Sequence, residues 1–509
     1  MNRLTEAPRS PIVRVSVPLQ SERGERVLRS ARTAADGVAI RRTGPTGIGE
    51  YDPLVLATRN GRTAFFASPT VSTVREAVAE LDSGELPTAD AEAVVEHDPE
   101  TTTLPAPGDG PLAVGQRRAL GPCGWVDPLD PATCRLRTAG VDAATIVDAG
   151  LLGRGRGDAA ADEPVGDAWQ TVQATDGEPV VVVNAHDADD RQQADRTLLA
   201  GAPMSVLDGV SAVAEFVDAT EAVIYLSEND TELQELLRQA VDAAAAELPV
   251  VPQLATGPDE YRAGAPTAAL EAMEGADRIE PRLQPPSPAE YGLHGRPTVV
   301  HTPRTFAQVH LALADPEAFG SDGAEARDPG TRLWTVTGDV AAPATVELGP
   351  GDELSAARNA VELEGSFKMA CTGGVFGGVT RSLDVAPTAA ALSAAGLGTE
   401  GAIELLNEDR CPVALAGERA AFAAEANSGR CVPGREGTTQ LTELLREVYQ
   451  GAYDEAGIRE LGRVMRRSSN CTLGAHAPRP AVTAMDEFGS SFEAHVDGRC
   501  PSGTCGETL

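Results

Sequence analysis

The sequence predicts a multidomain α/β protein that ends in a bundle of helices. The chain has 509 residues, too many for one hydrophobic core, and suits three or four domains of ~100 to 200 residues each. Up to about residue 330, short apolar runs rich in β-branched residues alternate with segments of helical periodicity. Beyond about residue 386 helical periodicity dominates, so the last part of the chain should be helical.

The first predicted domain covers residues 1–112. Its strands should be IVRVSV, VAIRR, PLVLAT and TAFFAS, and its helices SERGERVLRSARTAA and TVREAVAELDS. Helices that alternate with β-branched strands are typical of a small layered α/β domain. The acidic, proline-containing stretch from Leu86 to about Ala113 is predicted to be a linker.

Three further domains are predicted. Residues 113–328 contain the apolar runs VVVVNA and AVIYL, each followed by a helical segment, which indicates a mostly parallel sheet covered on both faces. Residues 329–385 contain TRLWTVTGDVAAPATVEL, which alternates like a β-hairpin with Pro343 near its turn. Residues 386–509 are predicted to form a helical bundle.

Composition narrows the classes of function. The chain carries 76 acidic against 42 basic residues, and Lys368 is its single lysine. The acidic residues are spread along the whole chain, which is typical of the hydrated surface of a halophilic protein. A nucleic-acid-binding protein needs a basic stripe, which this sequence lacks, so we expect no nucleic-acid partner.

The sequence also bears on location and on the use of cysteine. No apolar run reaches the ~18 residues needed to span a bilayer, and the N-terminus lacks the apolar centre of a signal peptide. We therefore expect a cytoplasmic protein without direct membrane insertion. The eight cysteines are too sparse for a disulfide scaffold, so they are candidates for core packing or metal binding.

A glycine-rich loop, Gly153-Arg154-Gly155-Arg156-Gly157, could close on a phosphate through its backbone N–H groups, although alone it is also typical of a flexible loop. Downstream lie, in this order, VVVNAHDADDRQQADR, GAPTAALEAMEG, PRLQPPSPAEYGLHGRPTVVHTPRTFAQV and GTRLWTVTGDVAAP. This series resembles the NADH-binding flavoprotein subunit of respiratory complex I and the matching subunit of hydrogenases. The resemblance extends to QRRALGPCGWVDPLDP before the loop and to EAHVDGRCPSGTC near the C-terminus.

The resemblance implies an identity for each of the four domains. In chain order these are a thioredoxin-like domain, a Rossmann-like FMN and NADH domain, a β-grasp (SLBB-like) domain and a helical bundle of the iron–sulfur-binding-region type. It also implies that the chain is one subunit of a redox complex. Its partners would be other subunits, and its location would be peripheral to a membrane redox complex.

The resemblance also assigns the residues nearest to the cofactors. They are the loop residues Gly153, Arg154 and Gly155, the residues Asn184 and Asp187 after the first apolar run, and His301 and Arg304 further on. The last two stand where the family has residues associated with the flavin phosphate. No catalytic residue is assigned.

Several positions depart from the family pattern. Arg156, Gly157 and Asp158 replace Gly-Ala-Gly in the loop, and Asp158 should repel a phosphate there. Ala265 and Pro266 replace the paired glutamates that face the nicotinamide nucleotide. Because charge-assisted donors contribute ~1.5 to 3 kcal/mol each, losing the family's lysines and asparagines should weaken FMN binding. FMN and NADH are retained as ligands that the site could still hold.

The expected iron–sulfur ligands are incomplete. A cluster needs four thiolates, and only Cys431 and Cys471 remain, while Ser428 and Gly434 stand at the other two positions that the resemblance compares. We therefore expect two buried thiols and no [4Fe–4S] cluster. The N-terminal domain has no cysteine, so no cluster is expected there either.

A second set of ligands is complete. His495, Cys500 and Cys505 are spaced H-x4-C-x4-C, and Cys411 matches a family cysteine before the cluster helix. Together they offer three thiolates and one imidazole, which is a ligand set for tetrahedral zinc. The alternative is a disordered tail without metal.

Three functions are consistent with these residues. The first is a subunit with eroded FMN, NADH and iron–sulfur ligands that serves a redox assembly structurally, by regulation or by weak nucleotide binding. The second is an active FMN-dependent NADH dehydrogenase subunit with a remodelled site. The third is a module that binds a small ligand through its β-grasp domain.

Overall fold

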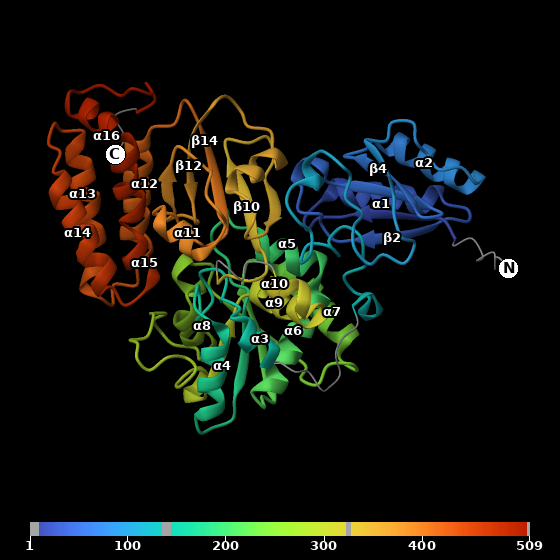
Figure 1. Cartoon of the computed structure of the whole chain (residues 1–509), viewed down its shortest axis with the longest axis horizontal. Helices are drawn as coiled ribbons and strands as arrows, with labels where there is room; N and C mark the ends of the chain where they lie inside the picture. The colour runs from blue at the N-terminus through green and yellow to red at the C-terminus, as the bar shows by residue number, and fades with distance from the viewer. Residues whose placement is uncertain (1–9, 135–143, 322–326, 506–509) are drawn as a thin grey trace.

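The computed structural model describes residues 10–134, 144–321 and 327–505. Within these residues the strands form three sheets, and the C-terminal helices pack beside the last of them (Figure 1). The N-terminal sheet and the helical bundle lie at opposite ends of the molecule, with the other two sheets between them. The chain is therefore a mixed α/β protein with several domains.

The N-terminal sheet has the strand order β2-β1-β3-β4-β5. Its elements are β1 (Ile12–Ser16), α1 (Glu22–Ala34), β2 (Ala39–Thr43), β3 (Leu54–Arg59), β4 (Arg62–Ala67), α2 (Val71–Ser83) and β5 (Ala93–Glu96). Ser21 and Thr70 cap the two helices through their hydroxyls, because each accepts from a backbone N–H three residues on. Strand β5 lies in the stretch predicted to be a linker, where it pairs antiparallel with β4.

The second sheet is parallel throughout, with the order β8-β7-β6-β9. The strands are β6 (Val180–Asn184), β7 (Glu221–Ser227), β8 (Gln253–Gly257) and β9 (Thr298–His301). Its helices are α3 (Ala144–Ala149), α4 (Val165–Ala174), α5 (Ala194–Gly201), α6 (Pro203–Phe216), α7 (Thr231–Ala244), α8 (Pro266–Met273), α9 (Pro303–Ala314) and α10 (Pro316–Ser321). Every residue of β6 is buried, as the apolar run VVVV predicts for a strand covered on both faces.

The third sheet has the order β11-β10-β14-β12-β13. Its strands are β10 (Arg332–Gly338), β11 (Ala344–Leu348), β12 (Phe367–Thr372), β13 (Gly378–Thr380) and β14 (Ala402–Asn407). Strands β10 and β11 form the antiparallel pair that the alternating sequence predicts. Strand β14 lies beyond residue 385, in the part predicted to be helical, and is the central strand of this sheet. The sheet therefore reaches further along the chain than the sequence indicates.

The remaining elements are helical. They are α11 (Ala389–Ala394), α12 (Pro412–Ala426), α13 (Thr438–Val448), α14 (Glu455–Ser468), α15 (Thr472–His476) and α16 (Arg479–Val496). Helices α12, α13, α14 and α16 pack their apolar faces around a core that includes Leu441, Ile458 and Phe492. No helix in the described ranges is by itself long and apolar enough to cross a membrane, and only the bent pair α5 and α6 passes that test together.

The N-terminal domain is seated directly on its neighbours. A Cβ added at Gly44 would lie 2.3 Å from the carbonyl oxygen of Ala200, in α5. Two backbone hydrogen bonds join the segment after β2 to the start of β11 and the residue before it, from Gly49 N to Pro343 O at 3.1 Å and from Thr345 N to Gly47 O at 2.6 Å. Backbone therefore packs on backbone, and no side chain separates the domains at Gly44.

Candidate functional site

The predicted cofactor residues gather at the carboxyl edge of the parallel sheet. Asn184 ends β6 and His301 ends β9, and the loop from Gly153 to Asp158 lies against both. Helix α9 begins at Pro303, so its N-terminus faces the same loop. This edge is where open α/β sheets bind their ligands, and a helix N-terminus there attracts anions.

A buried carboxylate occupies this helix N-terminus. The Asp158 side chain is 0% exposed. It accepts hydrogen bonds from the backbone N–H of Thr302 at 3.3 Å, the Thr305 hydroxyl at 2.7 Å and the backbone N–H of Ala160 at 2.9 Å. The donors that an anionic ligand would use are thus satisfied by the chain itself.

His301 extends this network into the core. Its Nδ1 lies 2.8 Å from Asp158, and its Nε2 accepts from the Trp169 indole N–H at 2.8 Å. Because indole only donates, Nε2 must accept, so the ring carries its proton on Nδ1 and donates to Asp158. His301 therefore holds the carboxylate in place rather than facing an open site.

Both predicted arginines are paired inside the protein. Arg154 donates to Asp328 at 2.8 Å and to the Pro329 carbonyl at 2.7 Å, and it is 2% exposed. Arg304 forms a fork on Asp195, with Nη2 to Oδ2 at 2.6 Å and Nε to Oδ1 at 3.1 Å. Neither guanidinium is free to bind a phosphate in this arrangement.

The glycine loop packs closely against Arg304 at Gly155 and is hydrogen-bonded to Asn184. Gly155 has a φ of +86°, and a Cβ there would lie 3.3 Å from the Arg304 Nε, so a glycine suits both the backbone and the space. Gly153 is also tightly enclosed, since a Cβ would lie 2.2 Å from the Ala160 oxygen. The Asn184 amide donates to the carbonyls of Gly157 at 2.9 Å and Gly264 at 3.0 Å.

Aromatic and basic side chains fill the space beside the loop. The Arg156 guanidinium lies 3.9 Å over the Tyr261 ring, and His186 stacks on Tyr225 with 5.3 Å between ring centroids. Burial, together with the nearby Asp189 carboxylate, raises the pKa of Asp187 to about 8, so this predicted ligand is mostly neutral at pH 7. The residues that sequence reasoning missed here are Asp158 as an acceptor and Tyr261 as the partner of Arg156.

Ala265 and Pro266 stand at the start of α8, beside the same loop region. Ala265 is buried and precedes the first helical residue, Pro266. Neither side chain has a polar atom, so this helix start offers no carboxylate to a ligand.

Cys431 and Cys471, the two cysteines that remain at the compared cluster positions, both lie in the helical bundle. Cys471 directly precedes α15, and burial, with the neighbouring Cys431 thiol adding to it, raises the pKa of Cys471. A Cβ added at Gly434 would lie 3.0 Å from the Cys431 sulfur. The structure thus brings Cys431, Gly434 and Cys471 together, but both thiols are only partly buried, whereas two buried thiols were expected.

The structure also assembles the predicted metal ligands. One ligand atom from each of Cys411, His495, Cys500 and Cys505 lies within 4.8 Å of the other three. The His495 Nε2 is 3.5 Å from the Cys411 sulfur and 3.4 Å from the Cys505 sulfur. Its Nδ1 contacts the Ser491 carbonyl at 2.6 Å, which turns Nε2 toward the thiols, as is usual for a metal-binding histidine.

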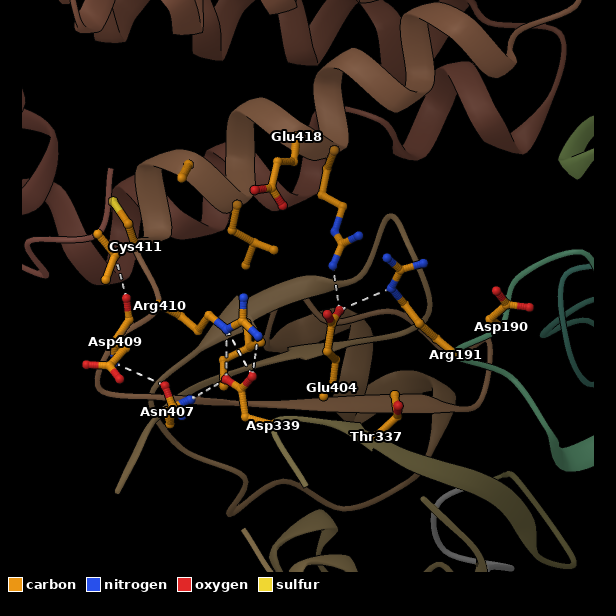
Figure 2. A pocket seen from close by; sticks show the side chains of 16 residues that line it. Asp190, Arg191, Thr337, Asp339, Glu404, Asn407, Asp409, Arg410, Cys411 and Glu418 are labelled. Atoms are coloured by element: carbon orange, nitrogen blue, oxygen red, sulfur yellow. Dashed lines mark hydrogen bonds and ion pairs between the residues drawn. The ribbon is translucent and has the colours of Figure 1, made fainter. Parts of the chain in front are cut away.

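A cavity of about 630 Å³ separates the third sheet from α12 (Figure 2). Glu404 is bridged by two arginines, Arg191 at 3.3 Å and Arg419 at 2.6 Å, and Arg410 pairs with Asp339. The arginines of this cavity are therefore compensated by carboxylates within it. That this sheet binds a small ligand stays a prediction.

Comparison with protein families gives two matches. Residues 146–311 match the model described as the Nuo51 FMN-binding domain. Residues 414–495 match the NADH-ubiquinone oxidoreductase-F iron-sulfur binding region. The first contains the loop, β6 and β9, and the second contains most of the bundle.

Two curated relatives cover most of the chain. It is 31% identical over 387 residues to the F subunit of NADH-quinone oxidoreductase from Streptomyces coelicolor, spanning 70% of this chain and 84% of that protein. It is 27% identical over 425 residues to the HndC subunit of NADP-reducing hydrogenase from Solidesulfovibrio fructosivorans, spanning 76% and 85%. A crystal structure of NAD+-reducing [NiFe]-hydrogenase in the H2-reduced state shares the fold, with a TM-score of 0.62, 22% identity, and coverage of 95% and 85%.

These findings correct the expectation about cofactors. The sequence led us to expect no [4Fe–4S] cluster, because only Cys431 and Cys471 remain at the compared positions. That expectation is wrong: residues 414–495 match an iron–sulfur binding region, and a complete set of three cysteines and one histidine gathers at its edge. The matched FMN-binding domain likewise makes FMN the cofactor to expect, rather than one ligand among several.

Proposed function

This chain belongs to the family of the NADH-quinone oxidoreductase F subunit. We propose that it is a subunit of an NADH:acceptor oxidoreductase assembly, in which the Asp158 carboxylate controls the binding of flavin. In this proposal Asp158 competes with the FMN phosphate for the N-terminus of α9. The chain then serves its complex as a structural or regulatory part that binds nucleotide weakly. The relatives are named as subunits of NADH-quinone oxidoreductases and hydrogenases, which supports other redox subunits as its partners.

One observation carries the proposal. The Asp158 carboxylate, 0% exposed, receives the Thr302 N–H, the Thr305 hydroxyl and the His301 imidazole. A phosphate placed on the same donors would lie against this carboxylate, and two anions so close in a buried site repel strongly. The residues as arranged therefore do not fit the phosphate end of FMN unless Asp158 moves away.

The neighbouring residues support the same interpretation. Arg154 and Arg304 are paired with Asp328 and Asp195, so they do not compensate a second anion. Ala265 and Pro266 give α8 no carboxylate, and the space beside the loop holds Arg156 on Tyr261. We further propose that the four domains are the thioredoxin-like, Rossmann-like, β-grasp and iron–sulfur-region domains predicted from the sequence.

The second candidate function is an active FMN-dependent NADH dehydrogenase subunit. The observation that favours it is the match of residues 146–311 to an FMN-binding domain. In that case the Asp158 side chain turns out of the site when FMN binds. FMN would supply the hydride acceptor, and this chain's loop and the N-terminus of α9 would bind its phosphate.

Removing the carboxylate tests the proposal. We expect Asp158→Gly to bind FMN at least about tenfold more tightly than the native chain, because the repelling charge is gone and the α9 donors are released. Flavin fluorescence quenching on titration with FMN measures the affinity. Asp158→Asn keeps the shape of the side chain without its charge, so its affinity for FMN should lie between those of the native chain and Asp158→Gly. It still tests the proposal if Asp158→Gly fails to fold.

The outcomes separate the two functions. Asp158→Gly should lose about 3 kcal/mol of unfolding free energy, since its donors lose their acceptor, and added inorganic phosphate should restore part of it. Two results together would contradict the regulatory proposal and support the active dehydrogenase. The native chain would purify with tightly bound FMN, and neither substitution would change the affinity for FMN.

We also propose that Cys411, His495, Cys500 and Cys505 hold the metal of the C-terminal domain. The spacing within 4.8 Å lets all four bind one centre, and the imidazole is already oriented by Ser491. The match to an iron–sulfur binding region supports iron with sulfide at this centre rather than a single zinc ion.

Substitution of one thiol tests this metal site. Cys500→Ser should lose most of the bound metal, measured by elemental analysis for iron and zinc and by acid-labile sulfide. Cys431→Ser is the matched control, because this thiol lies outside the set, and it should keep the native metal content. Loss of metal in the Cys431 variant, with retention in the Cys500 variant, would reverse the assignment.

A further inference from the structure

A groove of about 540 Å³ runs between α14 and α16 on the bundle. The helices approach closely at Gly462, where a Cβ would lie 3.0 Å from the Pro478 Cβ. The ion pair of Arg459 with Asp486, at 2.8 Å, marks one end of the groove. Arg466 and Arg479 line its other end, where α14 finishes and α16 begins.

The charge of this groove is opposite to that of the chain. The chain has 76 acidic and 42 basic residues, yet the groove is lined by four arginines, Arg459, Arg463, Arg466 and Arg479, and one acidic residue, Asp486. Positions 459, 463 and 466 share one face of α14, since they follow helical spacing. An accumulation of like charge on so acidic a protein indicates an electrostatic role.

Two of the four arginines form no ion pair with a residue that the structure describes. Arg459 pairs with Glu455 and Asp486, and Arg463 pairs with Glu460. The Arg466 side chain makes no hydrogen bond or ion pair within the described ranges. The cationic end of the groove is therefore only partly compensated, by the Glu400 and Asp162 carboxylates that act on Arg479 without pairing with it.

Arg479 is the more enclosed of the two. Its Nη1 donates to the Phe376 carbonyl at 3.3 Å, and it has no ion pair in the part of the chain that the structure describes. Burial lowers the pKa of Arg479, which reflects the cost of holding a cation away from water. Its backbone begins α16, which is kinked at Phe488 and whose N-terminal end carries a partial positive charge.

We propose that this end of the groove binds a small molecule through a phosphate or diphosphate group. Arg466 and Arg479 supply the planar donors that match phosphate oxygens, and the start of α16 adds its dipole. The volume lies in the ~300 to 1,000 Å³ range usual for small-molecule sites. Neither Arg466 nor Arg479 is among the residues that bond Asp158, so the test below does not depend on the function proposed above.

Calorimetric titration of the full-length protein with inorganic pyrophosphate, at constant ionic strength set with sodium chloride, tests the proposal. We expect saturable binding that weakens at least about tenfold in Arg466→Gln and in Arg479→Gln, since each removes a charge-assisted donor. Arg467→Gln is the matched control, because Arg467 follows on the same helix, is exposed and does not line the groove. It should keep the native affinity.

Two results would overturn the site. One is the absence of saturable pyrophosphate binding to the native chain. The other is an equal loss in Arg467→Gln and Arg466→Gln, which would mean that net charge alone attracts the anion. Arg466 is exposed, so its variant should fold and keep the test decisive even if Arg479→Gln is unstable.

Discussion

Asp328→Ala should lower the free energy of unfolding by about 3 to 5 kcal/mol, the usual cost of leaving a buried charge without its partner. The Asp328 carboxylate accepts hydrogen bonds from Arg154 at 2.8 Å, from Arg332 at 2.9 Å and from the Ala389 N–H at 2.8 Å. All three charged side chains are at most 5% exposed. The substitution therefore removes the ion-pair partner of Arg154 and one of the two partners of Arg332, which keeps Asp162 at 2.9 Å.

Urea denaturation followed by circular dichroism measures this loss. Glu460→Ala is the control, because the pair of Glu460 with Arg463 is exposed, and its effect on stability should be much smaller. Equal destabilisation by the two substitutions would contradict the role assigned to burial.

The same carboxylate should give an acid-dependent component of stability. Burial alone would raise the pKa of Asp328, but Arg154 and Arg332 outweigh it and lower that pKa to about 2. A lowered pKa stabilises the fold above the unfolded value near 4, and this stability is lost as the pH falls through about 2, with a magnitude of roughly 2 kcal/mol. Asp328→Ala should therefore remove part of the native loss of stability between these pH values.

Glu347→Ala should also be strongly destabilising, by about 3 kcal/mol or more, because it leaves several buried donors without an acceptor. Glu347 is 0% exposed and accepts from the backbone N–H groups of Ala119 and Leu120, both at 3.0 Å, and from the Thr331 hydroxyl. It thereby fastens the segment before the parallel sheet to β11. Burial raises the pKa of this carboxyl, and its hydrogen-bond donors oppose the rise.

The midpoint of thermal unfolding measures the loss of stability. The rate of proteolysis near residue 119 measures the release of the segment that Glu347 holds. Glu347→Gln keeps one oxygen acceptor but turns an NH2 group toward the other donors, so its loss should be intermediate. If Glu347→Ala unfolds at the native midpoint and resists protease equally, the segment is held by its other contacts.

Most of the fold could be predicted because its strands are apolar and its helices are amphipathic. The run VVVV is fully buried in β6, and β10 pairs with β11 as the alternating sequence indicates. Strands β5, β8, β9, β12, β13 and β14 were not predicted individually, and β5 and β14 show why. Strands β5 and β14 are short, and their sequences AVVE and AIELLN do not distinguish strand from loop or helix until β4, β10 and β12 supply hydrogen-bonding partners.

The candidate site could be predicted only in part. Family order placed Asn184, His301 and Arg304 near the glycine loop, and the structure brings them there. The sequence did not show that Asp158 would bond His301, 143 positions away, or that Arg154 would pair with Asp328, 174 positions away. Such long-range partners depend on the tertiary fold, so the sequence indicates that Asp158 repels a phosphate but not that its carboxylate takes the place of one.

The contact at Gly44 has a consequence for the N-terminal domain, which holds no thiol. A methyl group at this position would press on the Ala200 carbonyl of α5, the helix that also carries Asp195, the partner of Arg304. A displacement of α5 there would also bear on the ion pair of Asp195 with Arg304, near the other end of this helix. Deleting the N-terminal domain would expose one side of α5 and the edge of β11 to solvent. The shortened protein should therefore aggregate rather than behave as an independent flavin domain.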